Sequence, residues 1–310
     1  MLSLAEDGAA RSAQEARDPI ACDVLVAGGG MAGVAAAVAA ARAGARVILV
    51  ERHGFLGGAA TAGSVGQFVG WETRRGRRVI GGIAAEIVEA LAGAGGSAGH
   101  GRFVMSTGTV MDRVEYDPEI LKLVLDRIVG EAGAEILFHA VLADARRQGA
   151  RVTAVTLSTP SGPIRIEADC FVDASGDLAL LTRAGARFLP LEEGDRLQPA
   201  TMMFAMAPID FERLDAVSPE EKQAIVAKGL AAGALPRAAL HYSRVPGTEI
   251  AWFNVTRVDV DVDDPFSLGR AEMEGRRQAF RVADFVTAHL PGYMVPDAVR
   301  FLPALPSTAT

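Results

Sequence analysis

Two apolar runs enclose an alanine-rich stretch near the start of the chain. Residues 23–27 and 46–50 are dominated by valine, leucine and isoleucine, which is typical of buried parallel strands. Between them, Met31 to Ala43 is rich in alanine, the best helix former, and predicts a helix. Glycines separate the first run from this helix. The pattern therefore predicts a strand, a glycine turn, a helix and a second strand.

The glycine turn has the spacing of a dinucleotide-binding fingerprint. Gly28, Gly30 and Gly33 follow the G-x-G-x-x-G pattern, which suits a tight turn, close approach of a pyrophosphate and close helix packing. The helix start would then offer free N–H groups and a positive dipole end to the phosphates. Glu51 comes 23 residues after Gly28, where a carboxylate accepts ribose hydroxyl hydrogen bonds. A purely structural glycine turn would explain neither the acid nor the uncapped helix start.

Further along the chain, the apolar pattern changes period several times. Helical spacing with start and stop signals predicts four more helices, at residues 81–91, 118–129, 219–232 and 268–290. Asp117 and Ser218 are the expected caps of the second and third of these. A short helix is also expected after Asp177, to about Ala184. Strands are expected at residues 135–140, 141–147, 152–158, 164–168, 170–173, 198–206 and 249–258. The three strands from 141 to 168, separated by turns, predict an antiparallel meander.

Composition and charge narrow the functional class. The chain has 310 residues, is 50% hydrophobic and carries a net charge of −7, which gives no reason to expect nucleic acid as a partner. No apolar run reaches the length of a membrane span without charge, and residues 1–20 predict a disordered leader rather than a secretory signal. Cys22 and Cys170 both fall in apolar strands, so we expect both to be buried and the protein to be cytoplasmic. No metal site is expected.

Several segments carry candidate chemistry without a unique interpretation. A loop of small residues follows Glu51 and leaves room for a planar group near the backbone. His53, in this loop, is either a reacting residue or merely polar. The basic run at residues 74–78 is either a solvated hairpin loop or a contact for an anion or a partner. A polar cluster in the second half is either a loop or a site for a substrate carboxylate; its candidate residues are His241, Tyr242, Arg244 and Arg257.

These motifs resemble a known family. The opening unit, the Gly57-Gly58 loop, the meander and Val-Asp-Ala-Ser-Gly-Asp at 172–177 resemble the glutathione-reductase-type FAD-binding fold. More narrowly, residues 20–305 are similar to the bacterial FAD-dependent oxidoreductase family. The resemblance implies an α/β fold: a Rossmann-like FAD-binding domain with a parallel sheet and an antiparallel three-stranded meander, plus an α+β substrate domain. The expected domains are 21–186 for FAD and 187–310 for the substrate.

The resemblance also assigns residues to the cofactor. Residues around the glycine turn would cradle the pyrophosphate, Glu51 and Arg52 would lie at the adenosine ribose, and Val141 would lie at the adenine. Residues of the loop after Glu51 would lie along the ribityl and flavin side, and those after residue 173 would close over the ADP half. The implied cofactor-binding set is Gly28, Gly30, Met31, Ala32, Gly33, Glu51, Arg52, Gly57, Gly58, Ala59, Val141, Ala174, Ser175 and Gly176.

One departure from the resemblance concerns the end of the chain. Relatives continue into a last core strand and a helix that points at the flavin, whereas this chain ends at Thr310. We therefore expect a C-terminally truncated member with an exposed strand edge and a tendency to form homo-oligomers. The expected activity is transfer of a hydride or electron pair between a small-molecule substrate and FAD. The alternatives are a catalytically incomplete remnant or subunit, or an NAD(P)-dependent dehydrogenase.

Overall fold

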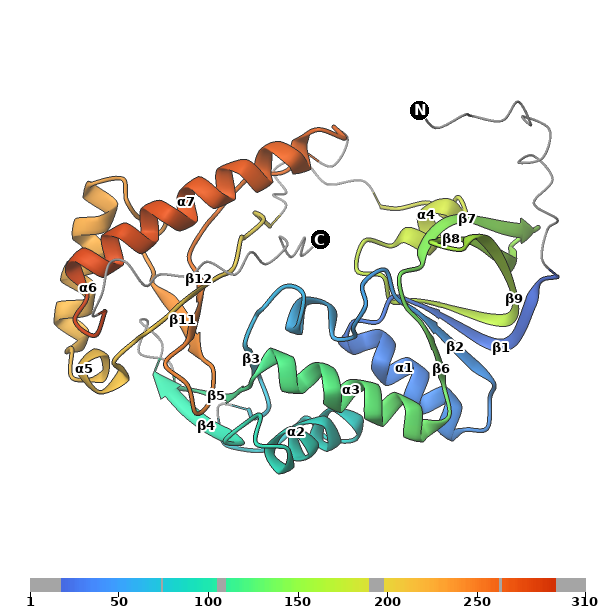
Figure 1. Ribbon diagram of the computed structural model, residues 1–310, viewed down its shortest axis with the longest axis horizontal. Helices are drawn as coiled ribbons and strands as arrows, with labels where there is room; N and C mark the ends of the chain where they lie inside the picture. Colours follow the sequence, from blue (N-terminus) through green and yellow to red (C-terminus); the bar gives the residue numbers. More distant parts are fainter. Residues whose placement is uncertain (1–17, 74, 105–109, 190–197, 262–263, 294–310) are drawn as a thin grey trace, which may run out of the picture. The chain divides into compact units, whose positions relative to one another are not determined.

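A computed structural model describes residues 18–293, except residues 74, 105–109, 190–197 and 262–263 (Figure 1). The expected leader therefore lies almost entirely outside the described residues. The chain divides into two compact units, each made of two segments. The first unit contains the chain up to Phe55 and Val129–Leu189, and the second contains Leu56–Ile128 and the chain from Pro190. This division differs from the expected single boundary at 187, because residues 56–128 belong with the C-terminal part.

The first unit is built on a six-stranded sheet with the order β6-β2-β1-β9-β8-β7. Strands β6, β2, β1 and β9 are parallel, and β9, β8 and β7 form an antiparallel meander. This matches the expected fold class. The strand bounds are β1 Ile20–Ala27, β2 Val47–Val50, β6 Glu135–Leu137, β7 Val141–Gln148, β8 Arg151–Thr159 and β9 Gly162–Asp173.

Two helices pack on this sheet. Helix α1, Met31–Arg42, contacts β1, β2 and β9, and the short helix α4, Ala179–Arg183, contacts β7 and β9. Leu25 and Leu49, in the central strands, are fully buried, as is Val34 of α1. Burying one such side chain contributes about 1.5–3 kcal/mol, so the apolar runs hold the glycine turn on a rigid base.

Strand β9 departs from the expectation. The segments 164–168 and 170–173 form one continuous strand, whose first half pairs with β8 and whose second half pairs with β1. The expected burial of Cys170 is wrong, because this cysteine is exposed, whereas Cys22 is buried. Cys170 pairs with Val24, which is only half-buried. That face of the sheet is incompletely covered within the described part of the chain.

The second unit contains two small antiparallel sheets. One has the order β3-β5-β4 and was not expected from the sequence; the other has the order β10-β12-β11. Their bounds are β3 Gln67–Val69, β4 His100–Val104, β5 Val110–Glu115, β10 Phe204–Met206, β11 His241–Arg244 and β12 Ala251–Asn254. Strands β10 and β12 are shorter than the expected strands 198–206 and 249–258. Phe204 and Phe253 stack in the core beneath them, with ring centroids 5.3 Å apart.

The remaining helices are η1 Gly58–Ala60, α2 Ile83–Gly93, α3 Pro118–Ala132, α5 Phe211–Asp215, α6 Pro219–Ala231 and α7 Ser267–His289. Four of them, α2, α3, α6 and α7, follow the sequence signals closely, whereas η1 and α5 were not expected. Asp117 caps α3 by accepting the N–H of Glu119 at 2.8 Å, and Ser218 forms a capping box with Glu221. Among the described residues, no helix is both long enough and apolar enough to cross a bilayer.

Candidate functional site

The three glycines of the fingerprint lie in the turn between β1 and α1 and in the first turn of α1, and the reason for glycine differs among them. Gly28 has φ +103°, and a Cβ there would lie 2.4 Å from the carbonyl oxygen of Ala174. A Cβ on Gly33 would lie 1.8 Å from the carbonyl oxygen of Gly28. Gly30, by contrast, has φ −66° and ψ 177°, which any residue adopts. Gly28 and Gly33 are therefore required by packing, whereas the backbone conformation at Gly30 does not explain its lack of a side chain.

The N-terminus of α1 has neither a side-chain cap nor an acidic residue in its first turn to offset its positive dipole end. Met31 is half-buried and Ala32 is exposed, so the first N–H groups lie at an accessible end of the helix. Such an end carries a partial positive charge and unpaired donors, which together favour a phosphate.

Glu51 links the glycine turn to the end of β2. This carboxylate is 6% exposed. Its Oε2 accepts the N–H of Gly29 at 2.7 Å, and its Oε1 accepts the N–H of His53 at 2.8 Å. Each carboxylate oxygen has a second lone pair, so both oxygens can still accept a ribose hydroxyl. The acid at the end of the second strand therefore positions the turn as well as offering acceptors.

The turn after β9 is held by Asp173. Its Oδ1 accepts the hydroxyl of Ser175 at 2.6 Å and the backbone N–H of Ser175 at 3.1 Å. Its Oδ2 accepts the N–H of Leu181 at 2.9 Å. Ala174 in turn donates its N–H to the carbonyl of Ala27, which joins this turn to the end of β1. Asp173 was not among the residues expected from the sequence, although an acid at a strand end before small residues is a usual signal for such a turn.

A cavity of about 290 Å³ lies between these segments within the first unit. Five of the expected cofactor residues line it, from four separate parts of the sequence: Gly28, Glu51, Arg52, Val141 and Ser175. Arg52 and Asp177 form an exposed ion pair at 3.5 Å on this cavity. The other lining residues were not expected from the sequence; they are Ala27, Val50, Ala140, Leu142, Asp177, Ala179, Thr182 and Arg183. Most of them are small or apolar and carry no signal of their own.

The other expected cofactor residues do not line this cavity. Gly30, Met31, Ala32 and Gly33 lie on the turn and first turn of α1, and Ala174 and Gly176 flank Ser175. Gly57, Gly58 and Ala59 belong to the second unit. A Cβ on Gly57 would lie 2.5 Å from Thr61, whose hydroxyl donates to the carbonyl of Leu56 at 2.6 Å. Gly57 therefore has a packing reason of its own.

His53 is an ionisable residue that lies two positions after Glu51 in the sequence. Its ring stacks on Phe55, with centroids 5.5 Å apart. Burial lowers the pKa of His53 from its usual value near 6.5, against a smaller opposing effect of the Glu51 charge. The neutral form therefore predominates at neutral pH.

The polar cluster of the second half is not a loop. His241, Tyr242 and Arg244 lie on strand β11, whose register with β12 pairs Tyr242 with Phe253. Arg257 lies after β12 and donates to Thr201 Oγ1 at 2.6 Å and to the carbonyl of Thr256 at 2.7 Å. Arg257 thus ties the segment at residue 201 to the end of β12, whereas Arg244 lines a separate cavity.

The fold of the first unit defines the class: an α/β protein with a Rossmann-like dinucleotide-binding unit. A family model described as FAD dependent oxidoreductase matches residues 23–304. The chain therefore belongs to the family of FAD-dependent oxidoreductases, which confirms the expected enzyme class and its cofactor, FAD.

Individual relatives agree with this class. The thiamine thiazole synthase of Aeropyrum pernix is 29% identical over 184 residues, which are 52% of this chain and 57% of that protein. The matched segment thus spans less than two thirds of that curated relative. The solved structure of p-nitrophenol 4-monooxygenase from Pseudomonas putida has a TM-score of 0.57 at 15% identity, covering 92% of this chain and 67% of that one.

A second solved structure supports the same fold. A geranylgeranyl bacteriochlorophyll reductase-like protein from Thermoplasma acidophilum has a TM-score of 0.54 at 14% identity, covering 91% of this chain and 64% of that one. Because the sequence identities are this low, both structural comparisons support only the fold.

The residues of the first unit fit FAD. The uncapped start of α1 suits the pyrophosphate, and Glu51 lines the cavity with acceptor capacity for a ribose. The backbone conformation at position 30 does not require glycine, and a residue without a side chain there suits close approach of a pyrophosphate to the backbone.

Proposed function

We propose that this chain binds FAD through the β1–α1 turn and takes part in transfer of a hydride or electron pair between the flavin and a small molecule. The observation that carries the proposal is Glu51, a buried acceptor tied to Gly29 and placed on a cavity beside the open start of α1. Bound flavin would supply the redox chemistry. The residues of this chain would bind and orient it.

Each group has a separate task in this proposal. The first-turn N–H groups of α1, with Met31 and Ala32 at that end, would hold the pyrophosphate, and Gly30 would let it approach. Glu51 would hold the adenosine ribose, with Arg52 beside it, and Val141 would offer backbone atoms to the adenine. Ala174, Ser175 and Gly176 would close over the ADP half, in a turn held by Asp173. Gly57, Gly58 and Ala59 would lie along the flavin side.

We also propose a substrate class, a cellular compartment and an oligomeric state for the protein. The substrate is a small molecule rather than a nucleic acid or a membrane, and the protein works in the cytoplasm. Self-association into a homo-oligomer is a prediction that size measurement in solution tests.

The experiment is reconstitution of purified protein with FAD, followed by anaerobic addition of candidate electron donors. The expected result is a yellow protein whose flavin absorbance bleaches with one of the donors and returns with an acceptor. A protein that takes up FAD but bleaches with no donor would favour the catalytically incomplete subunit. A protein that ignores FAD and binds a nicotinamide dinucleotide would favour the dehydrogenase alternative.

A further inference from the structure

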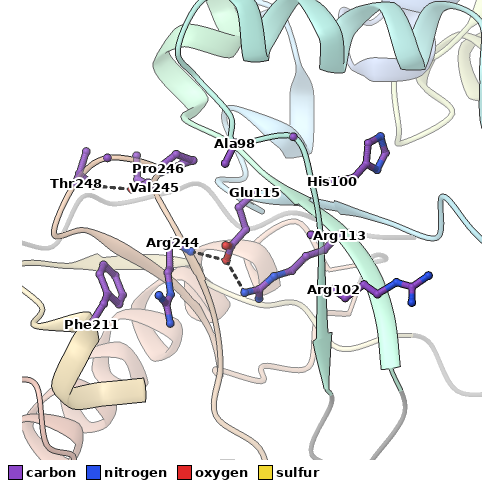
Figure 2. A pocket seen from close by; sticks show the side chains of 13 residues that line it. Ala98, His100, Arg102, Arg113, Glu115, Phe211, Arg244, Val245, Pro246 and Thr248 are labelled. Carbon is purple, nitrogen blue, oxygen red and sulfur yellow. Dashed lines mark hydrogen bonds and ion pairs between the residues drawn. The ribbon is translucent and has the colours of Figure 1, made fainter. Parts of the chain in front are cut away.

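The second unit contains a cavity of about 390 Å³ that the proposed function does not use. The paired strands β4 and β5 form one wall, and the end of β11 with the turn after it forms the other (Figure 2). Phe211, at the start of α5, lies on the same side as Arg244. The volume is within the usual range for small-molecule sites, about 300–1,000 Å³.

Basic side chains outnumber acidic ones in the lining of this cavity, and each basic side chain has a carboxylate partner, with His100 paired to Asp112 at 3.2 Å. The ionisable side chains of the lining are three arginines and one histidine against a single carboxylate: Arg102, Arg113, Arg244, His100 and Glu115. This excess contrasts with the net charge of the whole chain, which is −7. Positive lining in a concave, partly low-dielectric site concentrates anions from solution.

Two of the arginines are held in place by aromatic rings. The guanidinium of Arg113 lies over Phe103, 4.7 Å from the ring centroid. The guanidinium of Arg244 lies over Phe211, at 4.5 Å. A ring beneath a guanidinium fixes its plane and leaves its edge, which carries the N–H donors, for other partners. The two arginines are thus oriented before any ligand arrives.

Glu115 lies between these arginines and joins the two walls. Its Oε1 forms an ion pair with the Arg113 Nη2 at 3.3 Å and accepts the backbone N–H of Arg244 at 2.9 Å (Figure 2). Arg102 pairs with Glu72 at 3.1 Å, and Arg244 pairs with Asp215. Each of these ion pairs engages one terminal nitrogen of a guanidinium that has five N–H donors. Arg244 is the least satisfied, since its buried Nε has no hydrogen-bond partner among the described residues.

Two described residues of the basic run noted in the sequence, Gly76 and Arg78, lie near residues that line this cavity. A Cβ on Gly76 would lie 3.7 Å from the Arg102 Nη2, so the turn around Gly76 borders one of the lining arginines. Arg78 lies over the ring of Trp71, at 5.6 Å, and His100 meets the same ring edge-on. Gly76 thus lies next to the lining residue Arg102, and Arg78 shares the Trp71 ring with the lining residue His100.

We propose that this cavity binds the carboxylate or phosphate group of a small anionic molecule, with Arg113 and Arg102 as its main donors and Arg244 in support. Both oxyanions match the planar fork of a guanidinium, which binds them with paired hydrogen bonds. The proposal does not rest on the flavin chemistry, because the binding is measured without flavin.

The test is isothermal titration calorimetry with sodium phosphate and, separately, sodium succinate, each against sodium chloride at equal ionic strength. The expected result is saturable binding of at least one of the two probes. Arg113→Gln and Arg102→Gln should each weaken it by about tenfold or more, the scale of a lost charged hydrogen bond. Arg102 is well suited because its side chain is 68% exposed, so its replacement leaves the core intact. Binding of phosphate alone or succinate alone identifies the group that the site takes.

Two further variants sharpen the test. Arg151→Gln is the matched control, because Arg151 is an exposed arginine paired with Asp169 on the first unit, and its affinity should equal that of the unmodified protein. Glu115→Gln removes the one lining carboxylate and should tighten anion binding. The proposal is overturned if neither probe binds above chloride, or if Arg102→Gln and Arg113→Gln bind as well as Arg151→Gln. That last comparison also separates this cavity from phosphate held at the start of α1.

Discussion

The Oε2 of Glu51 accepts the backbone N–H of Gly29 at 2.7 Å, across 22 residues of sequence. This bond ties the end of β2 to the glycine turn after β1. The same carboxylate accepts the N–H of His53 through its other oxygen. One buried side chain therefore shapes the turn and presents acceptor oxygens to the adjoining cavity.

Replacing Glu51 by alanine should weaken FAD binding by about 1–3 kcal/mol, the scale of a lost charged hydrogen bond. It should also lower the free energy of unfolding, because two backbone N–H groups lose their acceptor. Fluorescence titration with FAD and denaturant unfolding measure the two effects. Glu167→Ala is the control: Glu167 lies on β9, its side chain is 43% exposed and pairs with Arg165, and its loss should change neither quantity appreciably. An unchanged FAD affinity for Glu51→Ala would refute the ribose assignment.

The glycines of the turn should separate into two classes. Gly33→Ala places a Cβ 1.8 Å from the carbonyl oxygen of Gly28, so we expect a large loss of thermal stability. Gly30→Val keeps an allowed backbone conformation, so it should leave the circular dichroism spectrum normal while abolishing FAD binding.

Gly130→Ala is the control for the stability measurement. Gly130 lies in α3, and a Cβ added there would meet no atom within 4 Å, so alanine should be neutral or stabilising by up to about 1 kcal/mol. Normal flavin uptake by Gly30→Val would show that the pyrophosphate does not approach that residue.

Asp173→Ala should loosen the turn at residues 174–176. Three hydrogen bonds to its carboxylate are lost, one of them to the Ser175 hydroxyl at 2.6 Å. We expect a loss of about 1–3 kcal/mol in unfolding free energy and a weaker affinity for FAD. Asp169→Ala, on the same strand with an 83% exposed side chain, is the comparison. Equal stability of the two variants would mean that Asp173 does not hold the turn.

His53 should make the fold less stable in mild acid. Burial lowers its pKa in the folded protein, so as pH falls below about 6.5 the unfolded chain takes up this proton first. Stability from this group is unaffected above that pH, and it declines below it until the pKa of the folded state is passed. His53→Gln should therefore flatten the fall of the melting temperature in this window. Thermal melts across the pH range measure this, and parallel curves for both proteins would contradict the prediction.

The opening unit was predictable because its signals are local. The apolar runs, the glycine spacing and Glu51 all lie within 29 consecutive residues, 23–51, and each follows from elementary backbone chemistry. The meander and the caps at Asp117 and Ser218 were predictable for the same reason. The exposure of Cys170 was not, because burial depends on what covers a face of the sheet.

The basic cavity could not be predicted from the sequence, for a physical reason. Its walls come from β4 and β5 and from the turn after β11, more than a hundred residues later. Strands β4 and β5 both carry charged residues and β4 also contains a glycine, so their periodicity is weak. Only long-range pairing brings Arg113 near Arg244. Of the three arginines that line the cavity, only Arg244 was a candidate from the sequence.

We expect the β1–α1 unit of this chain to bind FAD. The most direct measurement is titration of the flavin-free protein with FAD and, in parallel, with NAD, followed by flavin or protein fluorescence, for the unmodified chain and for Gly30→Val. We expect saturable binding of one FAD per unmodified chain, no comparable binding of NAD, and loss of FAD binding in Gly30→Val. Binding of NAD in place of FAD, or equal FAD affinity in both proteins, would contradict this expectation.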